Sequence, residues 1–555
     1  MPATVPMGNS TAAKALRLSN NEWSNKYFAI SIGVIMVLFT FHHWSSVIYF
    51  HYGPRKSNTT LNRCYRKTRR FLSGAQMGQR TDRCLLYGIY WAINLSLCLT
   101  NVNLNKITYV AKRLGWISVA NLVLLVFLAL KNTPLAPLTA KSYEKLRPLH
   151  KVAGYTCIFT SCLHGIVYLA AWSELGDLVS MQETRNLAGA IAGIAMVIIG
   201  LSTISYIMRG SYEIFYMLHV TMFLLIMITV GMHRPKLSTS TLIIVIFTAC
   251  LWFVDRIIRG AKVVWYFFGN YATVTALPNN ALRVRLSRCM NSRPGSHAFL
   301  WVPAIRWVES HPFTMLSSSP TEFLIRVYDG FTRDLYQAAQ KAPGRSLRCS
   351  VDGPYGQVHN FEVYDKAILI AGGSGASFTF AVSMDLIASS SRAVHSIDFI
   401  WVVRHQDSLE WFEQELKELQ DHPDVNVIIH VTSQVDPSAI LSSTPSDLVS
   451  EKASVKGDIT PPQPSPTSMD FDPEKGPFHQ PIAKALTSPN EIRQGRPDID
   501  KLIATAVNTS GNTNDRIIVG ACGPRELTAA TRKAVTDILR NDGPAITIYT
   551  EEFEW

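Results

Sequence analysis

Four histidines have the spacing expected of metal ligands on two helices. His150 and His164 are 14 residues apart, and the same number separates His219 from His233. In an α-helix, 14 residues rise about 21 Å and turn through about 1400°, which is about 40° short of four turns. Both histidines of each pair would therefore face one side of their helix. Because imidazole is a common metal ligand, two such helices could bind metal at two levels.

The histidines lie in the apolar half of a 555-residue chain in which only 17% of residues are charged. That composition indicates a protein that is partly embedded in lipid and has room for two or three domains. Residues 1–26 are mixed and polar and show no signal-peptide pattern. Beyond them, we predict membrane-spanning segments by length and apolar content. The seven segments are 27–50, 84–100, 115–130, 150–172, 187–207, 213–233 and 241–258.

Charges in the connecting loops predict how these segments are oriented. Residues 51–83 carry nine Lys and Arg against one acid, basic residues also follow the third and seventh segments, and the loop after the fourth is acidic. Since cytosolic loops are rich in Lys and Arg, we expect the N-terminus outside and the C-terminal half in the cytosol. The loop 101–113, with Lys106, Lys112 and Arg113, fits less well. The basic loops explain the net charge of +12 without a nucleic-acid partner.

This orientation places the four histidines at two levels of the membrane. Their two helices are two segments apart and so run in the same direction. His150 is then level with His219 near the cytosol, and His164 is level with His233 near the outer side. Two imidazoles at one level are the usual ligands of an electron-transfer haem, so we predict two haem b groups. The alternative, isolated polar residues at helix ends, is disfavoured by the repeated spacing and by the cost of polar groups in lipid.

Other potential metal ligands in the sequence lack such a pattern. His42 and His43 have no partner helix with matching spacing, and we interpret them as structural or interfacial. The nine cysteines form no CxxC pair, and their spacing predicts neither a zinc site nor a disulfide framework.

The second half of the chain changes from long apolar runs to short strands and turns. Residues 269–357 alternate like a small antiparallel barrel and contain the run His311-Pro312-Phe313-Thr314. A buried strand at 367–371 leads into Gly372-Gly373-Ser374-Gly375 and then a helix at 378–388. A strand, a glycine-rich turn and a helix together form a site where backbone N–H groups can bind a phosphate.

In this order, the motifs resemble those of the flavocytochromes that include fungal ferric reductases and NADPH oxidases, whose flavin domain is ferredoxin-reductase-like. The resemblance covers about residues 115–555, and it is close to a short yeast subgroup of probable metalloreductases, some described as superoxide-producing NADPH oxidases. It implies that FAD lies against the HPFT run, with a threonine hydroxyl near the flavin ring. It also implies that a later group helps to hold the FAD diphosphate, although this chain has Asp329-Gly330 where the family often has two glycines. The implied FAD residues are His311, Pro312, Phe313, Thr314, Arg326, Gly330 and Thr332.

The resemblance likewise implies an NADPH site in the last third of the chain. The family usually has a proline soon after its glycine-rich turn, whereas this chain has Ala376-Ser377-Phe378. An arginine after a Trp-containing strand contacts the 2′-phosphate, a Cys-Gly-Pro lies by the nicotinamide, and a terminal aromatic covers the flavin. We expect the cysteine to lie near the hydride path without acting as a nucleophile. The implied residues are Gly372, Gly373, Gly375, Arg404, Cys522, Gly523, Pro524 and Trp555.

The predicted fold is a multi-pass α-helical membrane bundle, followed by a cytosolic ferredoxin-reductase-like β-barrel FAD domain and an α/β nucleotide-binding domain. We expect an N-terminal tail at 1–26, the di-haem bundle at 27–262, the FAD domain at 263–357 and the NADPH domain at 358–555. Residues 434–514 are rich in Ser, Thr, Pro, Asp and Gly and are predicted to be a disordered insertion.

The predicted function is electron transfer from cytosolic NADPH through FAD and two haems to an acceptor across the membrane. The acceptor is expected to be a ferric or cupric chelate, which would make the protein a metalloreductase of iron and copper homeostasis. Two alternatives stay open: a superoxide-generating NADPH oxidase that reduces O₂, and a membrane transporter or scaffold with a degenerate reductase half. The sequence does not distinguish the plasma membrane from the endoplasmic reticulum, and it does not indicate an oligomeric state.

Overall fold

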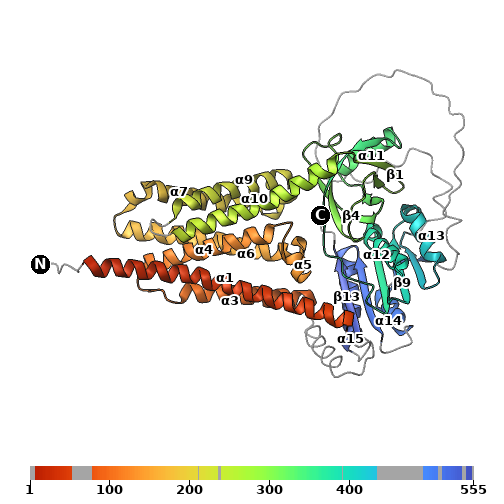
Figure 1. The fold of residues 1–555 in the computed structure, drawn as a ribbon, viewed down its shortest axis with the longest axis horizontal. Helices are drawn as coiled ribbons and strands as arrows, with labels where there is room; N and C mark the ends of the chain where they lie inside the picture. Colours follow the sequence, from red (N-terminus) through yellow and green to blue (C-terminus); the bar gives the residue numbers. More distant parts are fainter. Residues whose placement is uncertain are drawn as a thin grey trace, which may run out of the picture.

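A bundle of long helices and two β-sheets lie at opposite ends of the molecule (Figure 1). The computed structural model describes residues 7–52, 78–210, 212–234, 239–390, 392–433, 492–509, 515–540 and 545–552. The N-terminal end of α1 lies at the end of the bundle farthest from the sheets, which we call the distal end. The long helices are α1 (Met7–Tyr52), α3 (Gly78–Leu99), α4 (Ile107–Ala129), α6 (Tyr143–Glu174), α7 (Thr184–Ser202), α9 (Tyr212–His233) and α10 (Thr239–Phe267).

The predicted segment 187–207 runs past the end of α7 at Ser202 into the short helix α8 (Ser205–Gly210), whereas each of the other predicted segments lies, to within one residue, on one of these long helices. Six of them are long and apolar enough to cross a membrane, and Cys84–Leu99 of α3 is a shorter apolar helix. Within α3, the buried Asn94 accepts a hydrogen bond from Asn121 on α4 at 2.7 Å. These two side-chain amides thus satisfy one another inside the bundle, as an apolar surround requires.

Two helix pairs form the centre of the bundle. Helix α4 packs along α6, and α7 packs along α9. Small side chains at the contacts, such as Ala153 of α6 and Ala195 of α7, are fully buried and let the helices approach closely. Large apolar side chains, including Phe159 and Ile194, are exposed on the outer surfaces of the helices, where lipid would cover them.

The antiparallel sheet closes into the predicted barrel. Its strand order is β6-β1-β2-β5-β4-β3-β7, and β6 and β7 are separated only by Cys349. Since β6 pairs with β1 and β7 pairs with β3, one stretch of chain joins the two edges of the sheet. The elements are β1 (Tyr271–Leu277), β2 (Ala281–Leu286), β3 (His297–Trp301), β4 (His311–Ser318), β5 (Thr321–Arg326), α11 (Phe331–Lys341), β6 (Ser346–Arg348) and β7 (Ser350–Tyr355).

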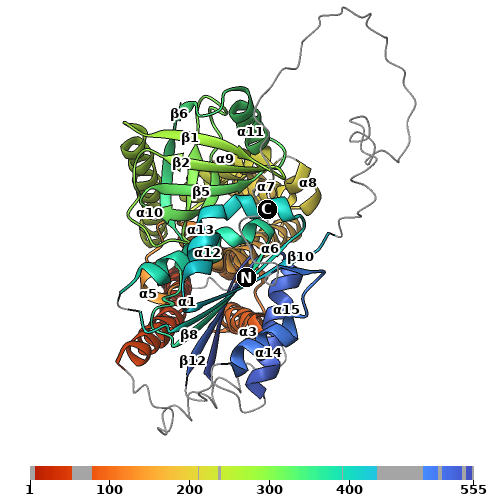
Figure 2. The same cartoon turned by 90° about the vertical axis from the view of Figure 1, so that its right-hand side faces the viewer.

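The second sheet is parallel throughout, with strand order β11-β10-β9-β8-β12-β13. Figure 2 shows it beside the barrel, with α14 and α15 together on one flank. The order reverses direction between β8 and β12, which is where such sheets bind ligands at their carboxyl ends. The elements are β8 (Lys366–Gly372), α12 (Ala376–Ala388), β9 (Ser396–Val403), α13 (Glu413–Asp421), β10 (Val425–Val431), β11 (Ile492–Gln494), α14 (Ile499–Asn508), β12 (Arg516–Cys522), α15 (Arg525–Arg540) and β13 (Ala545–Glu551).

The prediction of disorder over 434–514 is wrong for residues 492–509. There β11 extends the parallel sheet beside β10, and α14 buries Ile499 and Ile503 against it. Asp498 caps this helix by accepting a hydrogen bond from the backbone N–H of Lys501. The polar composition of the preceding stretch concealed a short amphipathic helix, and residues 434–491 lie outside the described part of the chain.

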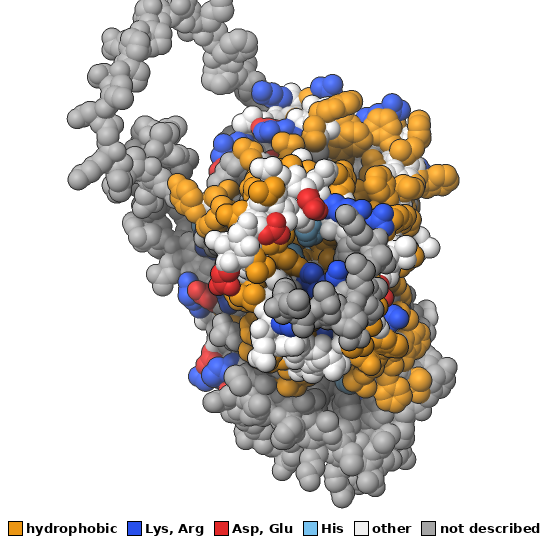
Figure 3. Space-filling view, turned by 90° about the vertical axis from the view of Figure 1, so that its left-hand side faces the viewer, with side chains coloured by type: hydrophobic (Ala, Val, Ile, Leu, Met, Phe, Trp, Pro, Cys, Tyr) orange, Lys and Arg blue, Asp and Glu red, His pale blue; other side chains and the backbone are white. Residues whose placement is uncertain are grey.

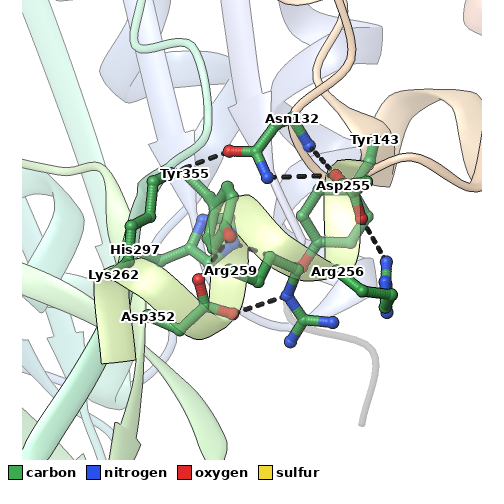
Figure 4. Close-up of polar contacts among 9 residues, drawn as sticks. All are labelled: Asn132, Tyr143, Asp255, Arg256, Arg259, Lys262, His297, Asp352 and Tyr355. Atoms are coloured by element: carbon green, nitrogen blue, oxygen red, sulfur yellow. Dashed lines mark hydrogen bonds and ion pairs between the residues drawn. The ribbon is translucent and has the colours of Figure 1, made fainter. Parts of the chain in front are cut away.

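The membrane bundle and the barrel share a helix and a network of buried ions. Helix α10 continues to Phe267, five residues beyond the predicted boundary at 262. From it, Arg259 donates to the Asp352 carboxylate of β7 at 2.7 Å (Figure 4). Asp255 accepts from the backbone and side chain of Asn132, and Lys262 donates to Asn132 at 2.8 Å. Each buried carboxylate therefore has donors, without which its burial would be costly.

The barrel is also joined to the nucleotide-binding sheet through an arginine. Arg283 of β2 donates to Glu322 of β5, with Nε at 2.9 Å from the carboxylate, and to Glu415 of α13. Both carboxylates are nearly buried, so their charge depends on this guanidinium. The neighbouring Arg285 is mostly exposed and reaches only Glu322, at 3.5 Å.

We expect Arg283→Met to destabilise the barrel and the nucleotide-binding sheet by about 3–5 kcal/mol, because Glu415 then loses its cation and Glu322 keeps only the exposed Arg285. Thermal unfolding of the full-length protein, followed by flavin release, measures this. Arg285→Met is the matched control and should change the midpoint little, since an exposed ion pair contributes about 0–1 kcal/mol. Equal midpoints for the two variants would contradict the assignment.

Candidate functional site

The structure brings the four bundle histidines together as two pairs. The ring centroids of His150 and His219 are 6.5 Å apart, and those of His164 and His233 are 5.9 Å apart. The first pair is nearer the sheets and the second is nearer the distal end, because α6 and α9 both run away from the sheets. The pairing by level that the sequence predicts is therefore present in the structure.

Three of the four imidazoles are oriented by a backbone carbonyl of a neighbouring helix. The Nδ1 of His150 lies 3.1 Å from the Leu125 oxygen, and the Nδ1 of His164 lies 2.7 Å from the Ala111 oxygen, both on α4. On α7, the Arg185 oxygen lies 2.8 Å from the Nδ1 of His233. Since a carbonyl can only accept, each Nδ1 carries the proton, and each Nε2 keeps its lone pair for a metal.

His219 is the exception, because its buried Nδ1 has no hydrogen-bond partner. A buried imidazole without a partner is costly unless another group satisfies it. A metal bound at Nε2 of His219 would account for the burial of the ring. The Nδ1 of His219 would still need a small shift of the ring, or a water molecule, to gain a hydrogen-bond partner. This histidine is therefore the least constrained of the four.

Two glycines make room for the distal pair. A Cβ on Gly115 would lie 2.9 Å from the His164 ring, and a Cβ on Gly189 would lie 2.5 Å from Nδ1 of His233. Distances under 3.0 Å force atoms to move, so only glycine allows these rings to rest against α4 and α7. Sequence reasoning missed both glycines, since an isolated glycine in an apolar helix gives no sign of which ring it faces.

The residues fit haem better than a metal ion bound by protein alone. Among the described residues, no group of three or more His, Cys, Asp or Glu could hold a metal ion. Two imidazoles suffice for haem, because its macrocycle supplies the other donors. The ring separations also suit one metal between two imidazoles, since each metal–nitrogen bond is about 2 Å and each ring centre lies about 1 Å behind its nitrogen.

The HPFT run forms the start of β4. His311 stacks on Phe331 with centroids 4.9 Å apart, and Phe313 lies 6.4 Å from the same ring. Thr314 is opposite His297 of β3, and side chains in opposite positions share one face of a sheet. His297 in turn lies 2.8 Å from the Glu144 carboxylate in the first turn of α6. This face of the barrel therefore adjoins the helix that carries His150, about 9 Å farther along its axis.

The proposed diphosphate residues surround the N-terminus of α11. Gly330 has φ +79°, which favours glycine, and immediately precedes the helix. The Thr332 hydroxyl donates to the Tyr328 carbonyl and accepts from its N–H, both at 2.8 Å, so it fixes the turn. Arg326 is exposed at the end of β5, beside the Tyr328 ring. Helix dipole, free N–H groups and an exposed arginine together suit a phosphate.

The glycine-rich turn after β8 and the Cys-Gly-Pro turn after β12 are in contact. A Cβ on Gly372 would lie 2.7 Å from Pro524, and one on Gly375 would lie 2.6 Å from the Cys522 carbonyl. Gly523 has φ +154° and leaves no room for a Cβ beside the Gly372 backbone. The two turns thus form one glycine-lined edge at the point where the strand order reverses, which suits close approach of a dinucleotide.

The remaining nucleotide residues lie around this edge. Arg404 is exposed directly after β9, beside β8 in the sheet. Cys522 is fully buried, and burial raises the pKa of its thiol well above the ordinary value. The thiol therefore stays protonated, in agreement with a role other than nucleophile. Trp555 lies outside the described residues.

The first turn of α6 contacts both the barrel and the parallel sheet. Tyr143 packs on His297 and Tyr355 of the barrel, with ring centroids 6.0 and 5.9 Å away. Lys145 forms an ion pair with Glu551 of β13 at 3.5 Å. Nearby, Lys131 lies 3.2 Å from the Phe299 ring centroid, and burial, assisted by Arg259, lowers its pKa to about 7. Sequence reasoning missed these contacts, because they join segments far apart in the chain.

His42 and His43 lie on α1, away from both histidine pairs. His42 is exposed, and the ring nearest to His43 is that of Trp44, at 5.9 Å. Neither packs against another histidine among the described residues.

Comparison with known proteins gives a consistent assignment along the chain. Residues 114–230 match the family described as "Ferric reductase like transmembrane component", 266–359 match "FAD-binding domain", and 364–536 match "Ferric reductase NAD binding domain". These regions cover the four helices α4, α6, α7 and α9 in whole or in part, the barrel, and the parallel sheet up to α15.

Similar curated proteins are fungal reductases. "Probable cell surface ferric reductase kap2" of Aspergillus oryzae is 26% identical over 57% of this chain and 46% of its own length. "Ferric reductase transmembrane component 3" of Saccharomyces cerevisiae is 25% identical over 80% of this chain and 62% of its own. The chain thus spans about half to two thirds of these relatives. Among solved structures, "Ferredoxin reductase in carbazole 1,9a-dioxygenase" is 16% identical over 50% of this chain and 67% of that one, with a TM-score of 0.31.

We expect Gly189→Ala to displace the His233 imidazole and to remove about half of the haem absorbance, since one of two levels is affected. The absorbance per protein in purified material measures this. Gly193→Ala, on the same helix, is the control, because a Cβ there meets nothing within 4 Å. Full haem content in Gly189→Ala would contradict the proposed ligand role of His233.

Proposed function

We propose that this chain, which belongs to the fungal ferric reductase and NADPH oxidase-like family, passes electrons from cytosolic NADPH across the membrane to a ferric or cupric chelate. The observation that carries this proposal is that the bundle holds two pairs of imidazoles, one above the other, and that the barrel and the nucleotide-binding sheet lie at one end of the bundle. The names of the relatives support a metal substrate, since they are ferric or ferric/cupric reductases.

FAD, when bound, converts hydride into single electrons, and haem carries single electrons. The residues of this chain would position both groups. Two levels of paired histidines would hold the haems, His150 with His219 and His164 with His233. The HPFT face of the barrel and the N-terminus of α11 would hold FAD beside the start of α6.

The nucleotide site would supply binding and orientation, without an acid or base. The glycine-lined edge formed by Gly372, Gly375 and Gly523 lets the dinucleotide backbone approach the sheet. Arg404 would bind the 2′-phosphate, because a guanidinium donates two parallel hydrogen bonds to such a dianion. A buried, protonated Cys522 would line the nicotinamide site without attacking it.

Separation of the NADPH end from the acceptor end supports a transmembrane reaction. The sheets lie at one end of the bundle, whereas His164 and His233 lie toward the other. The apolar helices between them would exclude water from the path. An acceptor at the distal end would then be reduced without meeting NADPH.

The proposal is tested by NADPH-driven reduction of a ferric chelate by purified full-length protein, with and without superoxide dismutase. We expect reduction that persists with dismutase and is lost in His164→Ala with His233→Ala, which breaks the distal pair. His42→Ala should leave the rate unchanged. Reduction that disappears with dismutase would instead support superoxide formation, and absence of NADPH oxidation with any acceptor would support a degenerate reductase half.

We expect Arg404→Gln to raise KM for NADPH by about 10- to 100-fold, since hydrogen bonds to charged groups contribute about 1.5–3 kcal/mol. The KM for NADH should stay constant, because NADH lacks the 2′-phosphate. Steady-state kinetics with both nucleotides measure this, and Lys417→Gln, exposed on α13, is the control. An equal loss for NADPH and NADH would contradict the phosphate role.

A further inference from the structure

Four basic side chains gather at the distal end of the bundle. Lys14 and Arg17 lie on α1, Lys106 immediately precedes α4, and Lys112 lies in the second turn of α4. We call them the distal basic cluster. Two of them belong to the loop 101–113, whose charge is unusual for a non-cytosolic segment. Because Lys and Arg are usually concentrated in cytosolic loops, basic residues on the other side need a local physical explanation.

The four side chains lie close together. The Arg17 guanidinium lies 4.8 Å from the Tyr109 ring centroid, and the Lys106 ammonium lies 5.4 Å from the same ring. Lys14 and Arg17 are near enough to Lys112 for their charges to act on it. No ion pair among the described residues includes any of the four. Like charges held this close repel one another unless an anion lies among them.

Arg113, the next residue, has a different role. It is 2% exposed, and its guanidinium donates to the Asn21 side chain and to the carbonyls of Leu97 and Thr100 at the end of α3. Its charge is thus satisfied by a helix C-terminus, which favours cations. These hydrogen bonds explain the presence of Arg113, but they do not explain the four residues of the distal basic cluster.

The cluster adjoins the distal histidine pair. Lys112 directly follows Ala111, whose carbonyl accepts from His164 at 2.7 Å. Tyr168 packs on the His164 ring with centroids 5.1 Å apart, and it lies within electrostatic range of Arg17. A molecule bound by the cluster would therefore sit within a few side chains of the proposed outer haem.

Acidic groups at this end lie mainly on the other side of the pair. Glu174, Asp177 and Glu183 are exposed around the connection from α6 to α7, and Glu22 of α1 accepts from Ser240. Figure 3, which looks onto this end, shows a histidine surface in the middle of the face with basic and acidic side chains around it. The four basic side chains thus lie on α1 and at the start of α4, whereas the exposed acids Glu174, Asp177 and Glu183 lie around the connection from α6 to α7.

We propose that the distal basic cluster binds the carboxylate groups of an anionic metal chelate. This proposal rests on the proposed function and names the class of its substrate. Lys14 and Lys106 are exposed and can meet a ligand from solution, whereas Arg17 and Lys112 are half-buried and lie deeper. Several cations around one site suit a chelate that carries several carboxylates. The site selects acceptors by charge and holds them beside His164.

A carboxylate of the haem itself is the other group that such cations could bind. Arg185 is better placed for a haem carboxylate than the distal basic cluster is. The Nη1 of Arg185 is buried without a hydrogen-bond partner, and its own carbonyl accepts from His233. A buried guanidinium nitrogen beside the ring suits a group that is itself buried. The exposed cluster on the opposite side of the pair stays available to a chelate.

Direct binding of the redox-inert gallium(III)–citrate complex to detergent-purified full-length protein tests the proposal. We expect Arg17→Gln with Lys112→Gln to weaken binding by about tenfold, since each charge contributes a factor of about three to five at contact distance in water. Arg17→Lys with Lys112→Arg keeps both charges and should restore gallium citrate binding. Lys26 is an exposed residue of α1 outside the distal basic cluster, and Lys26→Gln should leave the binding unchanged. Binding by wild type should weaken as salt is raised.

Turnover and spectra separate this inference from the proposed function. With NADPH, the double variant should lose kcat/KM for ferric citrate but keep its rate with the cationic acceptor hexaammineruthenium(III). The haem spectrum and reduction potentials of the double variant should match those of wild type. Arg185→Gln, in contrast, should shift the reduction potential of the outer haem. Equal gallium citrate binding in the double variant and Lys26→Gln would overturn the inference, as would an altered haem potential in the double variant with unchanged binding. Neither result would affect NADPH-driven reduction of the cationic acceptor, which tests the electron path separately from the chelate site.

Discussion

Hydrogen bonds from three imidazoles to carbonyls of neighbouring helices are the constraint on which the bundle depends. A helix carbonyl normally accepts from its own helix, so His150, His164 and His233 can share these oxygens only where the helices pack closely. The contact of α4 with α6, and of α7 with α9, follows from this requirement. Gly115 and Gly189 allow it, since any side chain there would occupy the place of a ring.

Helices α6 and α10 connect the histidine-bearing bundle to the barrel and the parallel sheet. Helix α6 starts in contact with His297 of the barrel and Glu551 of the parallel sheet, and it carries His150 two turns later. Helix α10 enters the barrel without a break, and Arg259 on it neutralises the buried Asp352. The ion pairs of the junction range from the nearly buried Arg259–Asp352 to Lys145–Glu551, which is about a third exposed. A fixed junction keeps the face of the barrel that carries Thr314 and His297 near the His150–His219 pair.

Much of this arrangement follows from local sequence pattern. Because helical geometry is regular, the spacing of His150 and His164, and of His219 and His233, fixes which faces of α6 and α9 carry the histidines. Alternating residues predict the barrel strands, and an apolar strand followed by glycines predicts the turn after β8. Contacts between distant segments could not be predicted this way. Examples are Gly189 against His233 and Tyr143 against His297, which depend on tertiary packing. Helix α14 was missed because a polar, low-complexity stretch precedes it without an obvious boundary.

The central claim is that each imidazole pair holds one haem between its two nitrogens. The most direct measurement is the haem content and spin state of purified full-length protein, by pyridine haemochrome absorbance and electron paramagnetic resonance. The account predicts two haems per chain, both low-spin, because each iron has two strong axial nitrogen ligands and no open position. A single haem per chain, or a high-spin signal from an iron with one free axial position, would contradict it.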